Sequence, residues 1–256
     1  MSGYYIETDN ITVGYDGKAV VDKVCFQVNR GQILTLIGPN GCGKSTILKS
    51  IVGQLKLLDG VIVLEGKDIR QISANEMAKT MAIVLTSRIS PELMTCEDVV
   101  STGRYPYTGR LGLLGEEDKK IVKEALEQVD AMDIADRPFS AISDGQRQRI
   151  MLARALCQQP QIIVLDEPTS FLDIRYKLEL LSILKRMVRE KDLAVIMSLH
   201  EIDLARRVSD QVACVMDGKI DRIGPPEKIF SKEYIYRLYH MDPERYDKCF
   251  ETMEFV

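Results

Sequence analysis

A glycine-rich stretch at residues 38–45, Gly-Pro-Asn-Gly-Cys-Gly-Lys-Ser, constrains the fold of this chain more than any other feature. It follows the apolar run QILTLI at residues 32–37, which is typical of a strand buried on both faces. Apolar residues at helical spacing follow it. The stretch matches G-x-x-x-x-G-K-[ST] without gaps, a pattern that turns backbone N–H groups toward phosphate oxygens at a helix N-terminus. The sequence therefore predicts a strand, a phosphate-binding loop and a helix, in that order.

This pattern gives each part of the loop a task. Lys44 is expected to reach the β- and γ-phosphates, the Ser45 hydroxyl to bind Mg²⁺, and Thr46 to contact a phosphate. Cys42 is expected to be a small filler, with a redox role as the alternative. The candidate nucleotide-binding residues of the loop are Gly38, Pro39, Asn40, Gly41, Cys42, Gly43, Lys44, Ser45 and Thr46. A chance glycine-rich turn would not need the strand and the helix that are predicted on either side.

A second apolar run, IIVL at residues 162–165, ends in Asp166 and Glu167. Asp166 is expected to orient Mg²⁺ through water, and Glu167 to polarise the water that attacks the phosphate. Taken alone, two acidic residues after a strand are often only its polar end. Together with the phosphate loop, they indicate nucleotide hydrolysis.

The remaining pattern predicts an α/β fold. Apolar runs, among them QIIVLDEP at residues 161–168 and LAVIMSLH at 193–200, predict buried strands that alternate with helices, which is typical of a mostly parallel central sheet. Alternating residues at 4–15 and 20–31 predict antiparallel strands, and DQVACVMDGKIDRIG predicts a hairpin that turns at Asp217 and Gly218. Residues 91–159 carry a helical signal. One face of it is expected to hold Ile121, Val122, Ala125, Leu126, Val129 and Met132. We expect a core with an antiparallel β subdomain at about 1–90 and 160–225, an inserted helical subdomain at about 91–159, and a tail at 226–256.

Composition narrows the function classes. The net charge of −4 argues against a nucleic-acid-binding protein, which usually carries a basic surface. The six cysteines are scattered without a C-x-x-C pair, which argues against a zinc site or a disulfide framework. We expect neither a transmembrane segment nor a signal peptide. One basic segment, ISDGQRQRIMLARAL at residues 142–156, leaves a local nucleic-acid patch as an alternative.

Four motifs occur in the order found in the ATP-binding subunit of ABC transporters, which the chain resembles over nearly its whole length. They are residues 38–46, SDGQ at 143–146, LDEPTSFLD at 165–173, and His200 in SLHEID. The resemblance implies the P-loop NTPase fold of ABC ATPase type, with ATP as the nucleotide and two subunits paired head to tail around two ATP molecules. The signature residues Ser143, Asp144, Gly145 and Gln146 of one subunit would cap the γ-phosphate held by the other.

The resemblance also implies roles for single residues. His200 would contact the γ-phosphate, Asp173 would lie near the partner's phosphate loop, and Tyr15 would stack on adenine. Pro168 and Phe171 look like scaffolding. We expect the arginines of the basic segment, Arg147, Arg149 and Arg154, to serve in structural ion pairs rather than on nucleic acid.

The chain departs from the family pattern at Thr86, at Asp144 and at Ile142, where the family more often has Leu. Thr86 stands where the family usually has a Gln that touches Mg²⁺, so Thr86 is a candidate ligand with a shorter reach. Asp144 stands where the family more often has Gly. A carboxylate near the γ-phosphate would be repulsive, so we expect Asp144 to point outward.

The segment TCEDVVSTGRYPYTG from Thr95 resembles ATPases that serve iron-siderophore, haem and vitamin B12 uptake. The expected partners are a second copy of the chain and integral membrane permease subunits, with a substrate-binding protein as an indirect partner. The expected location is the cytoplasmic face of the membrane. The loop between Gly103 and Gly115 is a candidate permease contact. Alternatives are an importer of another cargo such as molybdate, a soluble ABC ATPase that acts on nucleic acid or ribosomes, and a phosphate-loop kinase.

Overall fold

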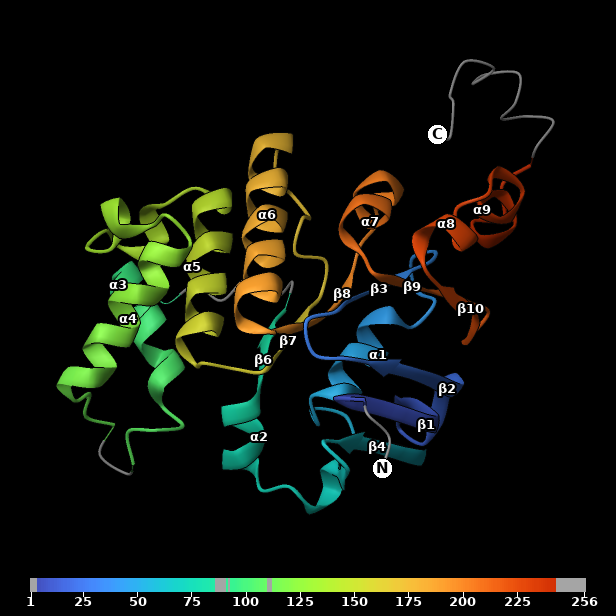
Figure 1. Ribbon diagram of the computed structural model, residues 1–256, viewed down its shortest axis with the longest axis horizontal. Coiled ribbons are helices and arrows are strands. Elements are labelled where there is room, and N and C mark those ends of the chain that lie inside the picture. The colour runs from blue at the N-terminus through green and yellow to red at the C-terminus, as the bar shows by residue number, and fades with distance from the viewer. Residues whose placement is uncertain (1–3, 86–90, 92, 110–111, 243–256) are drawn as a thin grey trace. The chain divides into compact units, whose positions relative to one another are not determined.

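The computed structural model describes residues 4–85, 91, 93–109 and 112–242 of the chain (Figure 1). The chain divides into two compact units. The first contains Met1–Asp68 and Ile196–Val256, and the second contains Ile69–Val195. The expected helical subdomain at 91–159 falls within the second unit, and its bounds remain a prediction.

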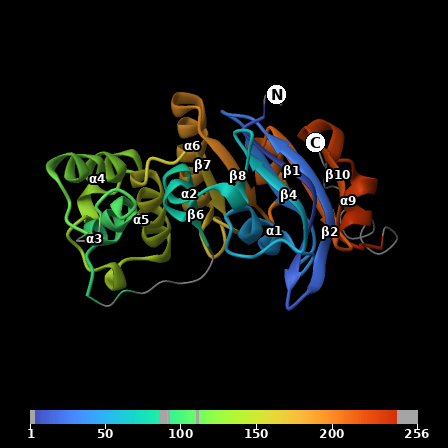
Figure 2. The same ribbon diagram turned by 90° about the horizontal axis from the view of Figure 1, so that it is seen from below.

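The first unit contains an antiparallel sheet in the order β2-β1-β4-β5. Its strands are β1 (Ile6–Tyr15), β2 (Lys18–Val28), β4 (Asp59–Leu64) and β5 (Lys67–Asp68). β1 and β2 form a hairpin in which Ile6 pairs with Val28 and Tyr15 with Lys18. Figure 2 shows β1, β2 and β4 side by side. The antiparallel strands expected from alternating residues are confirmed.

A second set of strands in this unit carries the phosphate loop. β3 (Ile33–Ile37) is buried throughout and pairs in parallel with β9 (Gln211–Met216). β9 turns into β10 (Lys219–Gly224) through Asp217 and Gly218, at φ 49° and 73°. Positive φ at both central residues is what a tight hairpin requires, and the predicted hairpin is confirmed. The helices of this unit are α1 (Lys44–Ile51), α7 (Ile202–Val208), α8 (Pro226–Ile229) and α9 (Lys232–Leu238).

The second unit contains the parallel pair β6 (Met81–Val84) and β7 (Ile162–Leu165), in which Met81 pairs with Ile162. β8 (Ala194–Ser198) begins here and ends in the first unit. The helices α2 (Ala74–Thr80) and α6 (Ile174–Lys191) belong to the same unit. The apolar runs at residues 162–165 and 194–198 are strands as predicted, and every residue in both is buried.

Three further helices of the second unit pack against one another, namely α3 (Cys96–Ser101), α4 (Glu116–Gln128) and α5 (Asp144–Cys157) (Figure 1). Short 3₁₀ turns lie at Ile69–Gln71, Thr102–Arg104, Met132–Ile134 and Phe139–Ala141. The expected apolar face of α4 is buried from Ile121 to Val129. Met132 was predicted on this face and is 42% exposed, because α4 ends at Gln128 and the helical repeat does not reach it.

The described residues include no helix that is both long and apolar enough to span a membrane.

Candidate functional site

The phosphate loop joins β3 to α1 in the predicted order, and its backbone requires glycine. Gly38 has φ 146° and Gly43 has φ 105°, a region that L-residues rarely adopt. A Cβ at Gly38 would lie 2.1 Å from the Val215 carbonyl oxygen, and one at Gly43 would lie 2.0 Å from Val21 Cγ2. β9 and β2 thus press against the loop at two glycines. The backbone approaches its neighbours, and could approach a ligand, more closely than any side chain allows.

Lys44 opens α1 and is buried. Its Nζ donates hydrogen bonds to the carbonyl oxygens of Gly38 at 2.8 Å and Pro39 at 2.9 Å. The ammonium therefore sits inside the curve of the loop. Burial raises the pKa of the neighbouring Cys42 thiol, although Lys44 lowers it. A thiol that stays protonated is a poor nucleophile, so this environment favours the expected packing role of Cys42 over a redox role.

Tyr15 and His200 belong to the same unit as the loop. Tyr15 ends β1 with 43% of its surface exposed, so its ring is open to a ligand. His200 directly follows Leu199, whose N–H donates to the Leu36 carbonyl at 3.2 Å. This bond places His200 beside the end of the strand that leads into the phosphate loop.

Sequence reasoning missed Tyr239, which follows α9. Among the described residues, its buried hydroxyl oxygen makes no well-aligned hydrogen bond, although the backbone N–H of Gly38 lies near it. Burial raises the pKa of Tyr239 to about 12, and the nearby backbone amide of Gly38 lowers it. The side chain therefore reaches the first residue of the phosphate loop, from a position about two hundred residues later that no local pattern connects to it.

Asp166 and Glu167 follow β7 in the second unit. The Asp166 N–H donates to the Val84 carbonyl at 2.9 Å, which extends the pairing of β6 and β7 by one residue. Glu167 has φ 49°, and its carboxylate accepts a 3.1 Å hydrogen bond from the Ser170 hydroxyl. Left-handed backbone at a residue other than glycine is uncommon and often accompanies function. The turn holds the Glu167 carboxylate in one orientation.

The signature residues form the start of α5. The Ser143 hydroxyl accepts a hydrogen bond from the Gln146 N–H at 3.3 Å, and the Gln146 side chain accepts one from the Ser143 N–H at 3.0 Å. The spacing S-x-x-Q predicts this reciprocal capping, although it was not among the predictions made from the sequence. A Cβ at Gly145 would lie 2.7 Å from the Tyr176 ring, so this position also requires glycine. The Asp144 carboxylate lies 3.5 Å from Arg147 on its own helix.

The arginines of α5 serve the fold. Besides its pairing with Asp144, Arg147 donates to the Ser140 carbonyl at 2.9 Å. Arg149 donates to the Asp130 carbonyl at 2.9 Å, and Arg154 to the Thr102 hydroxyl at 2.7 Å. The structural role is as expected, but these bonds of Arg149 and Arg154 go to neutral oxygens rather than to carboxylates.

The segment after Glu167 corrects one expectation. Phe171 was expected to be scaffolding, yet it is 80% exposed and has φ 64°. Leu172 beside it is the residue that is buried. Asp173 caps α6 by accepting a hydrogen bond from the Tyr176 N–H at 3.1 Å. Its contact with a partner subunit remains a prediction, and Thr86 lies outside the described residues.

The structure therefore assembles the predicted residues in two groups. The phosphate loop, Tyr15 and His200 lie in the first unit. Asp166, Glu167, Asp173 and the signature lie in the second.

Comparisons with known proteins identify the family. The ABC transporter family model matches residues 21–170. An uncharacterized ABC transporter ATP-binding protein of Methanocaldococcus jannaschii is 44% identical, over 97% of this chain and 86% of that protein. The iron(3+)-hydroxamate import ATP-binding protein FhuC of Bacillus subtilis is 35% identical, over 93% of this chain and 89% of its own length.

A solved structure shares the fold. It is the dimeric, post-hydrolysis ATP-binding cassette MJ0796 bound to ADP and Pi, with a TM-score of 0.75 and 26% identity. The match covers 86% of this chain and 98% of the cassette. The predicted fold class, a P-loop fold of ABC ATPase type, is confirmed. The chain belongs to the ABC transporter family, as one of the ATP-binding subunits that hydrolyse ATP to power transport.

Proposed function

We propose that this chain powers an importer through ATP-driven closure of a head-to-tail homodimer docked on permease subunits. The observation that carries the proposal is the phosphate loop. Gly38 and Gly43 have positive φ and lie against β9 and β2, and the buried Lys44 lies within the curve of the loop. Such a loop presents backbone N–H groups and a helix N-terminus to phosphate.

The residues present suit ATP and Mg²⁺. Lys44 and Thr46 would hold phosphate oxygens, and the exposed ring of Tyr15 would stack on adenine. Ser45 and Asp166 supply the oxygen donors that Mg²⁺ prefers. When bound, Mg²⁺ supplies positive charge against the phosphates. Thr86 remains a further candidate ligand.

Glu167 and His200 would act on the reacting phosphate. Glu167 would orient and polarise the attacking water, with the hydrogen bond from Ser170 holding its carboxylate. His200 would donate a hydrogen bond to the γ-phosphate. The N-terminus of α5 would present backbone N–H groups to the partner's nucleotide, because a 14-residue helix carries positive partial charge at that end. Asp144, drawn toward Arg147, would leave that approach open.

The cargo we propose is an iron-siderophore, haem or cobalamin. This choice is supported by the segment from Thr95 and by the relative named for iron(3+)-hydroxamate import. The chain would work at the cytoplasmic face of the membrane, where the loop from Gly103 to Gly115 would meet the permease. A substrate-binding protein would deliver cargo to the permease without touching this chain.

The test is phosphate release from ATP by purified wild type, Lys44→Ala and Glu167→Gln, with nucleotide binding measured by calorimetry. Lys120→Ala, an exposed lysine on α4, is the matched control. We expect Glu167→Gln to bind Mg-ATP but to hydrolyse it at least about a hundredfold more slowly than wild type. Lys44→Ala should lose binding, and the control should match wild type. Near-normal turnover in Glu167→Gln would overturn the role of that residue. Stimulation of the wild type by DNA or RNA would favour the soluble ATPase class instead.

A further inference from the structure

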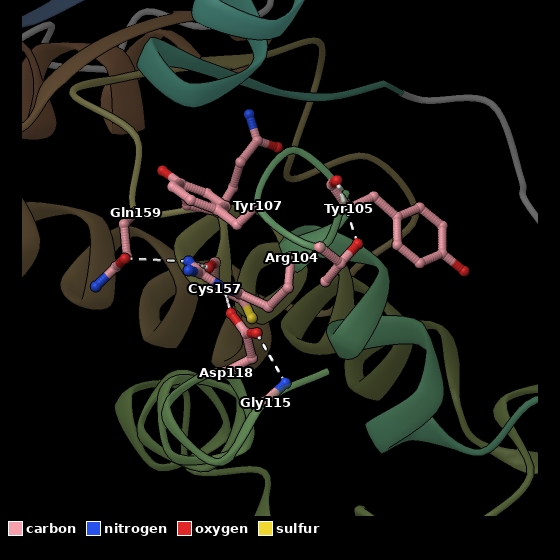
Figure 3. A network of polar contacts seen from close by, with 9 residues as sticks. Arg104, Tyr105, Tyr107, Gly115, Asp118, Cys157 and Gln159 are labelled. Atoms are coloured by element: carbon pink, nitrogen blue, oxygen red, sulfur yellow. Dashed lines mark hydrogen bonds and ion pairs between the residues drawn. The ribbon is translucent and has the colours of Figure 1, made fainter. Parts of the chain in front are cut away.

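Arg104 is buried, with 4% of its surface exposed. Figure 3 shows the polar groups around it. Its Nε donates to Asp118 Oδ1 at 2.9 Å, and its Nη1 donates to the Cys157 carbonyl at 2.9 Å and to Gln159 Oε1 at 3.0 Å. The guanidinium also lies 3.8 Å from the centre of the Tyr107 ring. A charge is buried at this depth only when such partners surround it.

The turn that carries Arg104 is fastened to the C-terminal end of α5. Besides the bond from Arg104 to Cys157, the Tyr107 hydroxyl donates to the Gln158 carbonyl at 3.0 Å. From the other side, Arg154 donates to the Thr102 hydroxyl at 2.7 Å. Gly103 packs so closely that a Cβ there would lie 2.4 Å from the Arg154 carbonyl oxygen. Hydrogen bonds in both directions and one close backbone approach therefore join the turn at residues 102–107 to the end of α5.

The same guanidinium holds the start of α4. Asp118 uses one carboxylate oxygen for Arg104 and the other to accept a 3.0 Å hydrogen bond from the Gly115 N–H (Figure 3). The bond from Arg104, followed by the bond from Gly115, lowers the pKa of Asp118 and keeps the carboxylate charged. Arg104 thus anchors both ends of the segment between residues 104 and 115.

We propose that Arg104 is a positioning residue for the signature Ser143–Gln146. α5 has 14 residues and spans about 21 Å, with Ser143 at its N-terminal end and the Arg104 contacts at its C-terminal end. A helix of this length transmits a displacement of one end to the other. Arg104 sets where the C-terminal end lies, and through it where the signature meets the partner's nucleotide. The inference rests on the proposed function, because it assumes that the signature acts across a dimer.

The test uses the full chain with Glu167→Gln, so that bound ATP is not consumed. Arg104→Lys keeps the positive charge but loses the planar guanidinium that donates several hydrogen bonds at once. Tyr107→Phe removes the hydrogen bond from the Tyr107 hydroxyl to the Gln158 carbonyl. Arg189→Lys, at an exposed arginine near the end of α6, is the matched control. For each variant, three quantities are measured. They are Mg-ATP binding to the dilute monomer, the Mg-ATP concentration at half-maximal dimer by light scattering, and the thermal midpoint.

We expect Arg104→Lys to raise the Mg-ATP concentration for half-maximal dimer about threefold to tenfold, with binding to the monomer unchanged. Tyr107→Phe should shift it less in the same direction, and Arg189→Lys should not shift it. If Arg104→Lys dimerises at the same Mg-ATP concentration as the parent Glu167→Gln, the inference is overturned and the proposed function is not. The inference is also overturned if Arg104→Lys loses nucleotide binding and dimerisation together, in proportion to a fall in its thermal midpoint. That pattern would indicate general destabilisation. A parent that never dimerises overturns the proposed function as well.

Discussion

Replacing Gly43 with alanine tests whether the phosphate loop depends on the close fit seen at that residue. Its φ of 105° costs an L-residue about 1–2 kcal/mol. The new methyl group would also lie 2.0 Å from Val21 Cγ2, and overpacking of this kind typically costs about 1–3 kcal/mol. We therefore expect Gly43→Ala to lower the free energy of unfolding by about 2–5 kcal/mol, the sum of the two costs. It should also weaken Mg-ATP binding, since the loop must shift to relieve the overlap.

Gly41→Ala and Val21→Ala separate the two costs. Gly41 has φ 77° with open space where its Cβ would lie, so alanine there should cost only the backbone strain, about 1–2 kcal/mol. Val21→Ala removes the methyl group that Gly43→Ala would strike. In the double variant, Gly43→Ala should be better tolerated by about 1–3 kcal/mol than in the wild-type background.

The assay is urea unfolding of the four variants and wild type, with Mg-ATP affinity measured by calorimetry. Effects of Val21→Ala and Gly43→Ala that simply add would refute the reasoning, because the two side chains would then not be in contact. Equal losses in Gly41→Ala and Gly43→Ala would indicate that backbone strain alone matters.

Three further predictions follow from individual contacts. Asp173→Ala should lower the free energy of unfolding by about 1 kcal/mol through loss of the α6 cap, whereas Asp173→Ser should retain most of it, as urea unfolding would show. The lowered pKa of Asp118 stabilises the fold above the ordinary carboxyl pKa of about 4, and this stability is lost as the pH falls through the folded-state value. Unfolding curves of wild type and Asp118→Asn should therefore converge on acidification, and a constant gap would contradict the shift. Tyr239→Phe removes a buried hydroxyl that makes no well-aligned hydrogen bond and should leave stability unchanged or raise it, whereas Tyr234→Phe loses a 2.8 Å bond to Asp221 and should cost about 1 kcal/mol. Equal losses in the two tyrosine variants would show that the Tyr239 hydroxyl is bonded in solution.

Local patterns predicted most of the fold. The runs at residues 33–37, 162–165 and 194–198 are strands because their apolar residues are buried on both faces. The hairpin at Asp217 and Gly218 followed from its turn residues alone. The ends of helices were harder to predict from the sequence. Met132 was placed on the face of α4 because the apolar repeat continues past the point where the backbone leaves the helix.

Contacts between distant segments could not be predicted from one sequence. The segment containing Arg104 was recognised as a family resemblance, but its bond to Cys157 joins residues 53 positions apart. Tyr239 beside Gly38 is a similar case. The scaffolding role expected for Phe171 came from the family resemblance and was wrong, because a left-handed backbone turns this residue to the surface.

The most direct test of the account is light scattering on purified Glu167→Gln with and without Mg-ATP, beside the same variant carrying Lys44→Ala. The account predicts a monomer that becomes a dimer only with Mg-ATP, and no shift when Lys44 is also replaced. A monomer under all conditions would contradict a nucleotide held between two copies of the chain, as would a dimer that forms without ATP or without Lys44.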